Sequence, residues 1–457
     1  MKVRTFTLNS KKEIISKITR EVLTLFKVEV VGREGEADFA QLSVVNHRQE
    51  VPAGAREGAK VCMETTLMLF SVDGSLKSYT RREFGKEDEL ERAAVNRTIK
   101  LNLYRIFCEE LGDAPAPWGI LHGVRPTKIV HRWIEYGMDE ESIVKRLMTD
   151  FACSEAKARI ITPMAFRQLP FLRTSDEKTI SIYVGGGTPT ALPDEEFAAM
   201  LKWVYDTFYR KDLAEFTVEA GRPDSITPAK IAAMREFKVT RVSVNPQTMQ
   251  ARTLKVIGRR HTPEDVVTMY KALREAGIPH INMDLILGLP GETAKDVADT
   301  MAKVTALNPD DITLHALALK RGSRLKLIME ERHVELPGTE ETRRMAETAM
   351  ACIDKQGYKP YYLYRQGYMA GDLENIGCCH AGAEGMYNIQ IMEEHQTIIG
   401  IGGSATTKVV DFARKRMKSS FNAKDLVTYL RDVDIYIDKR RALLEEAYGK
   451  QGEFSEC

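Results

Sequence analysis

The chain has 457 residues, a length typical of two or three domains, and its 66 Lys plus Arg balance 65 Asp plus Glu. This balance excludes a global electrostatic attraction to nucleic acid or to an anionic membrane. No apolar run reaches the length of a membrane span, and the N-terminus lacks a signal-peptide core. We therefore expect a cytoplasmic protein with no nucleic-acid or membrane partner.

Seven cysteines are scattered along the chain without any C-x-x-C spacing, which argues against a disulfide framework or a zinc site. Most are expected to be buried or unreactive thiols. The run Cys378-Cys379-His380 could ligate a metal, but neighbouring cysteines rarely point at one ion together. We predict no metal site there.

Residues 1–170 are predicted to form a small α+β module. Short strands broken by Gly and polar clusters are followed by amphipathic helices, and a turn-like polar stretch at residues 123–128 is expected to be a structural loop. The predicted strands are residues 26–32, 39–46 and 60–74, and the predicted helices are residues 88–111, 139–151 and 154–166. Nothing in this module demands catalysis.

Residues 171–330 alternate strictly between strand and helix patterns. This alternation predicts parallel strands with crossover helices, in an open sheet or a partial barrel, with ligands at the carboxyl ends of the strands. The predicted strands are residues 180–184, 215–220, 240–246, 281–290 and 311–319, and the predicted helices are residues 193–209, 227–238, 262–277 and 293–308. Residues 331–457 are expected to form a mainly helical C-terminal region.

Unusual residues gather at these predicted strand ends: the glycine turn Gly185, Gly186 and Gly187, then Glu219, Gln247, Arg259 and Asp284. Each has a purely structural alternative. The glycines could make a tight connection, Glu219 could pair with Arg222, Gln247 could cap a helix, and Asp284 could accept from backbone amides. Their coincidence at one end of the strands favours a binding site.

Five segments are recognisable: "IYVGGGTPT", "FTVEAGRPD", "VSVNPQT", "GRRH" and "INMDLILGLPGET". In order and spacing they resemble the radical SAM family of oxygen-independent coproporphyrinogen III oxidases. Downstream, "LENIG" and "YNIQIMEEHQTIIGIGGSA" are similar to that family's C-terminal region. The resemblance covers roughly residues 115–410, and the N-terminal extension makes the chain most similar to the coproporphyrinogen dehydrogenase branch.

The resemblance implies a site for S-adenosylmethionine. Gly185, Gly186 and Gly187 would cradle its methionine amino end, with Glu219 facing the same ligand. Gln247, Arg259 and Asp284 would contact its nucleoside part, a role that suits an amide, a guanidinium and a carboxylate. The family's reaction implies a 5'-deoxyadenosyl radical that starts the oxidative decarboxylation of two propionates of coproporphyrinogen III in haem biosynthesis.

Anionic propionates would need cationic partners. The candidates near the predicted strand ends are Arg222, Arg260, Lys320 and Arg321. The sequence assigns no catalytic residue and leaves the oligomeric state open.

The same resemblance also implies a 4Fe-4S cluster, held by three cysteines in a C-x-x-x-C-x-x-C loop after the first barrel strand. This sequence has no such loop, and the strand at residues 180–184 runs directly into the glycine turn. One βα unit is missing relative to the family, and the strand resembles a fusion of the first and second. We therefore expect either an oxidoreductase impaired by this loss or a protein that binds S-adenosylmethionine or a tetrapyrrole without radical chemistry. A purely structural module is a third alternative.

Overall fold

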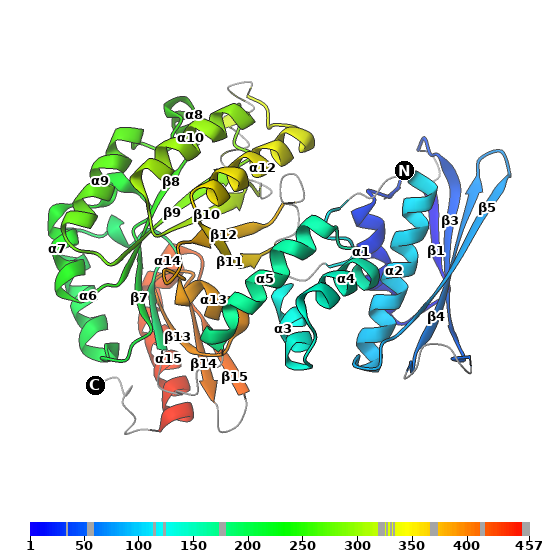
Figure 1. The fold of residues 1–457 in the computed structure, drawn as a ribbon, viewed down its shortest axis with the longest axis horizontal. Helices are drawn as coiled ribbons and strands as arrows, with labels where there is room; N and C mark the ends of the chain where they lie inside the picture. The colour runs from blue at the N-terminus through cyan, green and yellow to red at the C-terminus, as the bar shows by residue number, and fades with distance from the viewer. Residues whose placement is uncertain are drawn as a thin grey trace. The chain divides into compact units, whose positions relative to one another are not determined.

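A computed structural model gives the fold (Figure 1). It describes residues 1–32, 35–52, 59–112, 116–121, 125–172, 180–318, 325, 328–329, 331, 334–365, 373–411 and 416–449. The chain divides into two compact units, residues 1–126 with 132–163, and residues 127–131 with 164–457. No helix in the described ranges is both long enough and apolar enough to cross a membrane.

The first unit is an α+β module, as predicted. Its sheet has the order β2-β1-β3-β4-β5, with β1 parallel to both neighbours and β3, β4 and β5 antiparallel. The strands are β1 (Lys2–Leu8), β2 (Glu29–Val30), β3 (Phe39–Gln49), β4 (Cys62–Ser71) and β5 (Leu76–Phe84). The helices are α1 (Glu13–Leu25), α2 (Glu91–Leu111) and α4 (Glu140–Phe151), while α3 (Thr127–Glu135) and α5 (Glu155–Leu172) are each divided between the two units.

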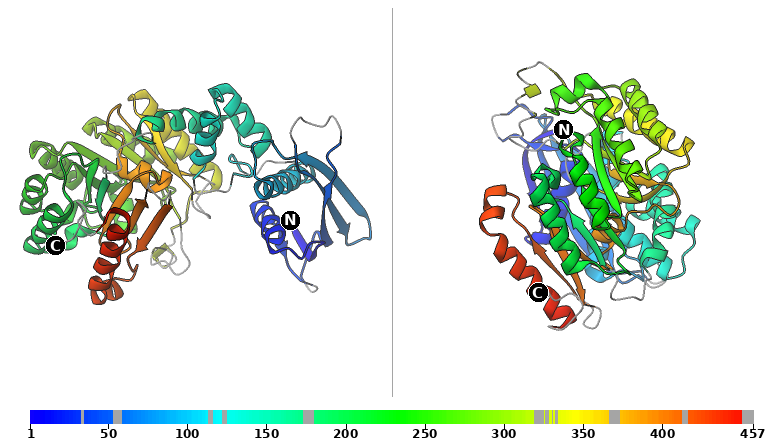
Figure 2. Two further views of the ribbon diagram at one scale, coloured as in Figure 1. Left: turned by 90° about the horizontal axis from the view of Figure 1, so that it is seen from below. Right: turned by 90° about the vertical axis from the view of Figure 1, so that its left-hand side faces the viewer.

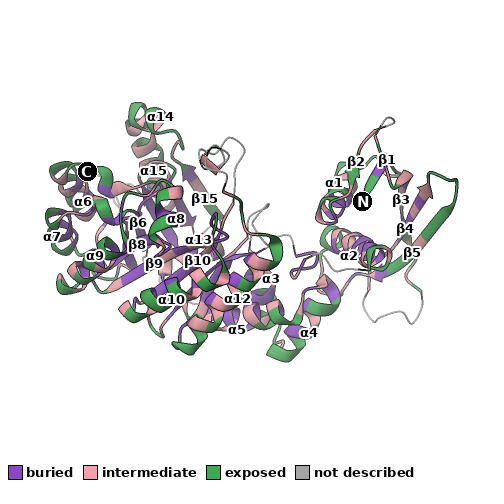
Figure 3. Ribbon diagram, turned by 90° about the horizontal axis from the view of Figure 1, so that it is seen from above, coloured by how far each residue is buried: buried purple, intermediate pink, exposed green. Residues whose placement is uncertain are grey.

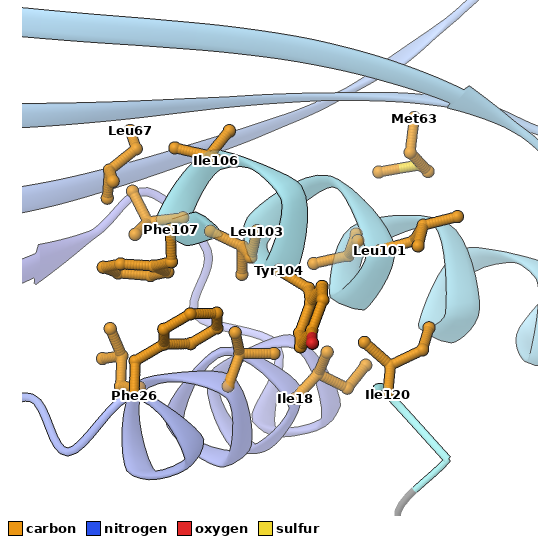
Figure 4. Close-up of a cluster of buried hydrophobic side chains, with 14 of the residues drawn as sticks. Ile18, Phe26, Met63, Leu67, Leu101, Leu103, Tyr104, Ile106, Phe107 and Ile120 are labelled. Carbon is orange, nitrogen blue, oxygen red and sulfur yellow. The ribbon is translucent and has the colours of Figure 1, made fainter. Parts of the chain in front are cut away.

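A hydrophobic core lies between this sheet and helices α1 and α2 (Figure 4). Leu103, Tyr104 and Phe107 of α2 are buried in it, and the Phe107 ring stacks on Phe26 with a centroid distance of 5.0 Å. Apolar burial of this kind is the main stabilising contribution to such a module. The sequence analysis did not predict β1, α1, α3 or β5. The expected loop at residues 123–128 is wrong at its end, because α3 begins at Thr127, and residues 123 and 124 lie outside the described residues.

The second unit contains one large sheet. Among the described residues its strand order is β11-β12-β10-β9-β8-β7-β6-β13-β14-β15. The strands are β6 (Ile180–Val184), β7 (Glu215–Glu219), β8 (Arg241–Gln247), β9 (His280–Leu287), β10 (Asp311–Ala316), β11 (Lys359–Tyr364), β12 (Asn375–Cys379), β13 (Thr397–Ile401), β14 (Thr406–Asp411) and β15 (Arg416–Phe421). The helices are α6 (Asp194–Phe208), α7 (Pro228–Glu236), α8 (Ala251–Val256), α9 (Pro263–Glu275), α10 (Ala294–Leu307), α12 (Thr339–Lys355), α13 (Met386–Glu393), α14 (Leu426–Arg431) and α15 (Val433–Tyr448).

The predicted parallel β/α array is confirmed: β6, β7, β8, β9 and β10 pair in parallel in that order. A further parallel strand, β13, lies on the other side of β6, in a register that joins Ile180 to Thr397 and Val184 to Ile401. The C-terminal region contains the expected helices, but it also supplies strands β11 to β15, which the sequence analysis did not predict. These strands belong to the same sheet as the barrel strands. The three-part domain division stays a prediction.

Helices cover the sheet in a way that explains its composition. α6, α7, α9 and α10 lie along one side of the parallel strands, while α13 contacts β6, β7, β11 and β13 from the other (Figure 1). Because the central strands are covered on both faces, they are almost entirely buried (Figure 3). α15 runs along the outer strands β14 and β15 (Figure 2).

The crossover helices begin where local capping signals predict. Thr262 precedes α9 and forms a capping box with Asp265, and Thr293 forms the same arrangement with Asp296 at the start of α10. These caps anchor the loops that follow β8 and β9. They therefore help to hold in place the strand ends that carry the predicted site residues Gln247 and Asp284.

Candidate functional site

The parallel strands enclose a cavity of about 290 Å³, which brings together side chains from six strands and from α13. Its lining is mostly polar and aromatic. The strands contribute Glu215, Arg241, Thr217, Ser243, Asn282, Thr313, Glu219, Asp284, His315, Tyr183, Tyr362 and Tyr364, and α13 contributes Tyr387. Glu219 and Asp284, both predicted site residues, therefore open onto one cavity.

A buried ionic network closes the amino-terminal end of this cavity. Arg241 donates to Glu215 at 2.8 Å and to Asp311 at 2.7 Å, and Tyr361 donates to the other Asp311 oxygen at 3.0 Å. Burial raises the pKa of Asp311 to about 7 despite Arg241, whereas Arg241 overcomes the effect of burial on Glu215 and lowers its pKa. This network fixes the strands and leaves its cation fully engaged.

The middle of the cavity is lined by uncharged hydrogen-bonding groups. The Asn282 amide donates to the Ser243 hydroxyl at 2.9 Å and to Asp284 at 2.7 Å, and its oxygen accepts from Thr313 at 3.2 Å. Neighbouring parallel strands supply these residues at matching register, Ser243 opposite Asn282 and Asp284 opposite Thr313. The ladder orients the Asp284 carboxylate.

Glu219, the last residue of β7, has an aromatic partner. The Tyr183 hydroxyl donates to its carboxylate, and the Tyr183 ring stacks on Tyr387 of α13 with centroids 3.9 Å apart and planes 3° from parallel. Burial raises the pKa of Glu219, and the nearby Asp284 carboxylate adds to the rise. The sequence analysis weighed Arg222 as the partner of Glu219 and did not identify Tyr183.

Asp284 and His315 form a charge pair at the carboxyl half of the cavity. His315 Nε2 lies 3.6 Å from an Asp284 oxygen, and its Nδ1 lies 3.4 Å from the Tyr364 hydroxyl. Burial opposes the charged form of both groups, but their mutual attraction outweighs it, so the pKa of Asp284 is lowered and that of His315 is raised. When protonated, His315 is thus paired with Asp284, and the Glu219 carboxylate also favours its charged form.

The glycine turn after β6 packs against a second glycine turn. A Cβ on Gly186 would lie 2.0 Å from the carbonyl oxygen of Gly403, and a Cβ on Gly402 would lie 2.2 Å from that of Gly185. Gly186 also has a φ of +76°, which other residues rarely adopt. A Cβ on Gly187, by contrast, would meet nothing within 4 Å. A Cβ on Gly185 would lie 2.3 Å from the Tyr183 ring. Packing therefore accounts for the first two glycines of this turn, and Gly187 is the one of the three that borders open space.

Gln247 has unusual geometry at the end of β8. Its φ is +68°, it follows a bulge in the pairing with β9, and its buried side-chain oxygen has no hydrogen-bond partner in the described structure. Strained backbone and an unsatisfied polar atom are features that cluster at ligand sites. His261 supports this strand end, because its Nε2 lies 3.3 Å from the Pro246 carbonyl.

Arg259 lies in the loop after α8, and its guanidinium donates to the Gly221 carbonyl at 3.0 Å. Burial and the nearby Arg222 lower its pKa, while Asp224 and Asp284 oppose the change. Neither Arg259 nor Gln247 lines the cavity itself. Arg222 and Arg260, two candidates for propionate binding, are exposed, and the other two, Lys320 and Arg321, lie outside the described residues.

Several residues of this site were not identified from the sequence, among them Tyr183, His315, Tyr364 and Tyr387. His315 sits inside the run "DITLHALAL", where a single histidine in a buried strand gives little signal, and Tyr364 and Tyr387 lie on elements beyond the predicted barrel. Alternation offered one clue, since His315 is two residues after Thr313 and so faces the same side of β10.

The six cysteines in the described part of the chain do not fit a 4Fe-4S cluster. No three His, Cys, Asp or Glu residues in the described ranges gather closely enough to hold a metal ion. Cys378 and Cys379 are buried neighbours on one strand, so their side chains point to opposite faces of the sheet. Burial raises the pKa of both thiols well above the usual range, which opposes the thiolate form that iron requires.

Comparison with known proteins adds a family context. The Radical SAM superfamily profile matches residues 166–304. The chain is 34% identical over 392 residues to the oxygen-independent coproporphyrinogen-III oxidase-like protein HemZ of Bacillus subtilis, covering 73% of this chain and 78% of that protein. It is 28% identical over 234 residues to the heme chaperone HemW of the same organism, covering 51% of this chain and 58% of HemW.

Among solved structures, the coproporphyrinogen III oxidase HemN of Escherichia coli, described as a radical SAM enzyme, aligns with a TM-score of 0.45 and 22% identity, covering 56% of this chain and 57% of HemN. The alignment with HemZ spans 392 positions but includes only 73% of the 457 residues of this chain, about 334 residues. HemZ therefore carries residues that have no counterpart in this chain.

Proposed function

Because the chain belongs to the family of oxygen-independent coproporphyrinogen-III oxidase-like radical SAM proteins, we propose that it binds S-adenosylmethionine at the carboxyl end of its barrel strands without cleaving it reductively. One observation carries the binding half of the proposal: Glu219 and Asp284, from different strands, line one cavity. The unpartnered oxygen of Gln247 lies at the end of β8, and Arg259, in the loop after α8, reaches the Gly221 carbonyl just beyond the end of β7; both side chains would serve the nucleoside.

The absence of reductive cleavage follows from the donor set. A cluster that leaves one iron open for S-adenosylmethionine needs three converging thiolates, and the seven cysteines of this sequence contain no C-x-x-x-C-x-x-C run. The family's oxidative decarboxylation of coproporphyrinogen III would then be lost with the cluster. Binding should also be weak, because iron chelation of the amino and carboxylate groups would no longer contribute.

Titration calorimetry with S-adenosylmethionine tests the binding half. We expect measurable binding by the unmodified chain, weakened by Arg259→Ala by about 2 kcal/mol, the usual cost of removing a charged hydrogen-bond partner. Arg235→Ala, an exposed arginine in the last turn of α7, is the matched control and should bind like the unmodified chain. No heat of binding from the unmodified chain would overturn the proposal.

Anaerobic reconstitution with iron and sulfide tests the other half. We expect far fewer than four irons per chain and no 5'-deoxyadenosine after addition of a reductant and S-adenosylmethionine. Inserting a βα unit with the family's cysteine loop between Val184 and Gly185 should restore both. A full cluster and 5'-deoxyadenosine from the unmodified chain would show that its own cysteines supply the ligands.

Tetrapyrrole binding is a second candidate, favoured by the exposed arginines Arg222 and Arg260 near the same strand ends. The cavity lies at the small end of the range for enclosed ligands, roughly 300–1,000 Å³, so a tetrapyrrole would bind outside it. An absorbance titration with coproporphyrin III tests this idea. Loss of affinity in the double variant Arg222→Ala, Arg260→Ala would support it, and unchanged affinity would exclude these two residues.

A further inference from the structure

Strand β5 lies at one edge of the sheet in the first unit, with β4 on its inner side (Figure 1). The Ser71 amide donates to the Ser75 carbonyl at one end of the β4–β5 ladder, and the Gly85 amide donates to the Val61 carbonyl at the other. The ladder between these two bonds runs without a register shift. Because hydrogen-bonded and non-hydrogen-bonded pairs alternate in an antiparallel ladder, the even-numbered residues of β5 point their backbone groups away from β4.

These outward backbone groups form an open edge. Within the described part of the chain, no hydrogen bond reaches the outward amides and carbonyls of Leu76, Ser78, Thr80 and Arg82, and all four residues are exposed. At the next even position the Phe84 carbonyl is occupied, because it accepts from Arg97 at 2.7 Å. The open edge therefore runs from Leu76 to Arg82, and such an edge is a template for pairing with another strand.

The charges of this edge are already balanced. Lysine and arginine on an edge strand usually discourage pairing with other strands. Each of the three cations between Leu76 and Arg82 has a glutamate partner in its own chain: Lys77 with Glu110, Arg81 with Glu109 and Arg82 with Glu64. Two such edges can therefore meet without bringing uncompensated positive charges together.

The backbone of β5 is complementary to itself. In an antiparallel pair of two copies with a two-fold axis at Thr80, the open groups of Ser78 lie opposite those of the partner's Arg82, and the two Thr80 residues lie opposite each other. These are all outward-pointing positions, so each would form a hydrogen-bonded pair of the new ladder.

The side chains favour this register over its neighbour. Centring the pair on Thr80 sets Lys77 opposite the partner's Glu83, a pair of opposite charge, and Glu83 already contacts Arg105 of its own chain at 2.9 Å. Centring it on the preceding residue would instead set Lys77 opposite the partner's Arg81, a pair of like charge. Opposite charges stabilise directly opposed positions and like charges destabilise them.

We propose that β5 joins two copies of this chain in a symmetric dimer, through an antiparallel β5–β5 pair centred on Thr80. The two five-stranded sheets then continue into each other, and both open edges are covered. A two-fold contact of this kind is closed, so it adds no further copies. The surface lies in the first unit and does not depend on the binding of S-adenosylmethionine.

Sedimentation analysis of the full chain over a range of concentrations tests the dimer. We expect a dimer that dissociates on dilution. Ser78→Arg should raise its dissociation constant about tenfold, because two like-charge pairs with Arg82 form in each dimer, whereas Ser78→Glu should lower it. Ala199→Arg, at an exposed position of α6, adds the same charge elsewhere and should dimerise like the unmodified chain.

Cysteine cross-linking tests the register. In the proposed pair the two Thr80 Cα atoms lie about 5.5 Å apart, within the range for a disulfide, whereas the two Ser78 Cα atoms lie about 13 Å apart. Thr80→Cys should therefore form a covalent dimer under mild oxidation, and Ser78→Cys should not. Both side chains are exposed, so the unfolding midpoints of these variants should stay close to that of the unmodified chain.

Three results would overturn the proposal. A chain that stays monomeric at every concentration would show that the edge does not pair with itself and would leave it to a different protein. A dimer that responds alike to Ser78→Arg and Ser78→Glu would use another surface. Covalent dimers of Ser78→Cys that form as readily as those of Thr80→Cys would exclude the register centred on Thr80.

Discussion

Gly186 and Gly403 lie backbone against backbone, so closely that a Cβ on Gly186 would come within 2.0 Å of the Gly403 carbonyl oxygen. This contact joins the turn after β6 to the turn after β13, and the amide of Gly185 adds a hydrogen bond of 2.9 Å to the Ile401 carbonyl. The two turns therefore lock β6 and β13 together at the carboxyl end of the barrel.

We predict that Gly186→Ala destabilises the protein by about 2–4 kcal/mol, because alanine would add both a left-handed backbone cost and a steric clash. Gly187→Ala is the matched control. A Cβ there meets nothing within 4 Å, so stability should hardly change. Urea unfolding measures both. If Gly187 borders the S-adenosylmethionine site, its alanine variant should weaken ligand binding with normal stability, and equal stability of both variants would contradict the packing described.

Replacing Arg241 by leucine should destabilise the protein by about 3–5 kcal/mol, because it leaves Glu215 and Asp311 buried without their cation. The control is Lys202→Met, which breaks an exposed pair with Asp206 and should cost less than about 0.5 kcal/mol. Chemical denaturation measures the difference between the two. A loss below about 1 kcal/mol for Arg241→Leu would mean that the network contributes little to the fold.

The His315 imidazole should titrate above its ordinary pKa of about 6.5, because Asp284 stabilises the charged form more than burial opposes it. The pair's contribution to stability is therefore present below about pH 6.5 and is lost as the pH rises through the folded pKa of His315. On the acid side, the lowered pKa of Asp284 keeps the contribution until the pH falls below about 3.9, and it is then lost as the pH falls through the folded value.

NMR titration of the His315 ring measures this pKa directly. In Asp284→Asn the pKa of His315 should fall, because burial lowers this pKa and the Asp284 carboxylate no longer opposes the effect. Glu219 still favours the charged ring and should limit the fall. An unchanged pKa in that variant would show that the two side chains do not interact in solution.

Cys378 and Cys379 should resist alkylation in the folded protein at pH 8, because both are buried and burial raises the pKa of each thiol. Cys108 and Cys352, which are only partly buried, provide the internal comparison and should react sooner. Mass spectrometry after timed labelling with iodoacetamide gives the order. Early labelling of Cys378 or Cys379 would show that these thiols are accessible, and they would then again be candidate ligands for an iron–sulfur cluster.

The barrel strands could be predicted because each is a short run of β-branched and apolar residues between two amphipathic helices, as in "TRVSVNP" and "INMDLILGLP". Strand β13 escaped prediction for a physical reason. Its sequence, Thr397–Ile401, contains a glycine, and its parallel partner β6 lies in a distant part of the chain, so local propensity carries no sign of the pairing.

Strand β5 was missed because its burial pattern is almost wholly exposed, so the sequence shows no alternation of polar and apolar residues. For the site, spacing alone brought Glu219 and Asp284 to the same end of the sheet. Their actual partners, Tyr183 and His315, depend on how neighbouring strands face each other across the cavity, and that register is set by the packed barrel.

The pairing of β6 with β13 also affects how the chain is synthesised. Ile180 leaves the ribosome long before its partner Thr397, and at 5–20 residues per second the delay between them is roughly 10–40 s. During that interval one edge of β6 has no strand to pair with, and an unpaired apolar edge is prone to association with other chains. The nascent barrel should therefore depend on chaperones until β13 emerges, and truncation before residue 397 should yield aggregates rather than a smaller folded barrel.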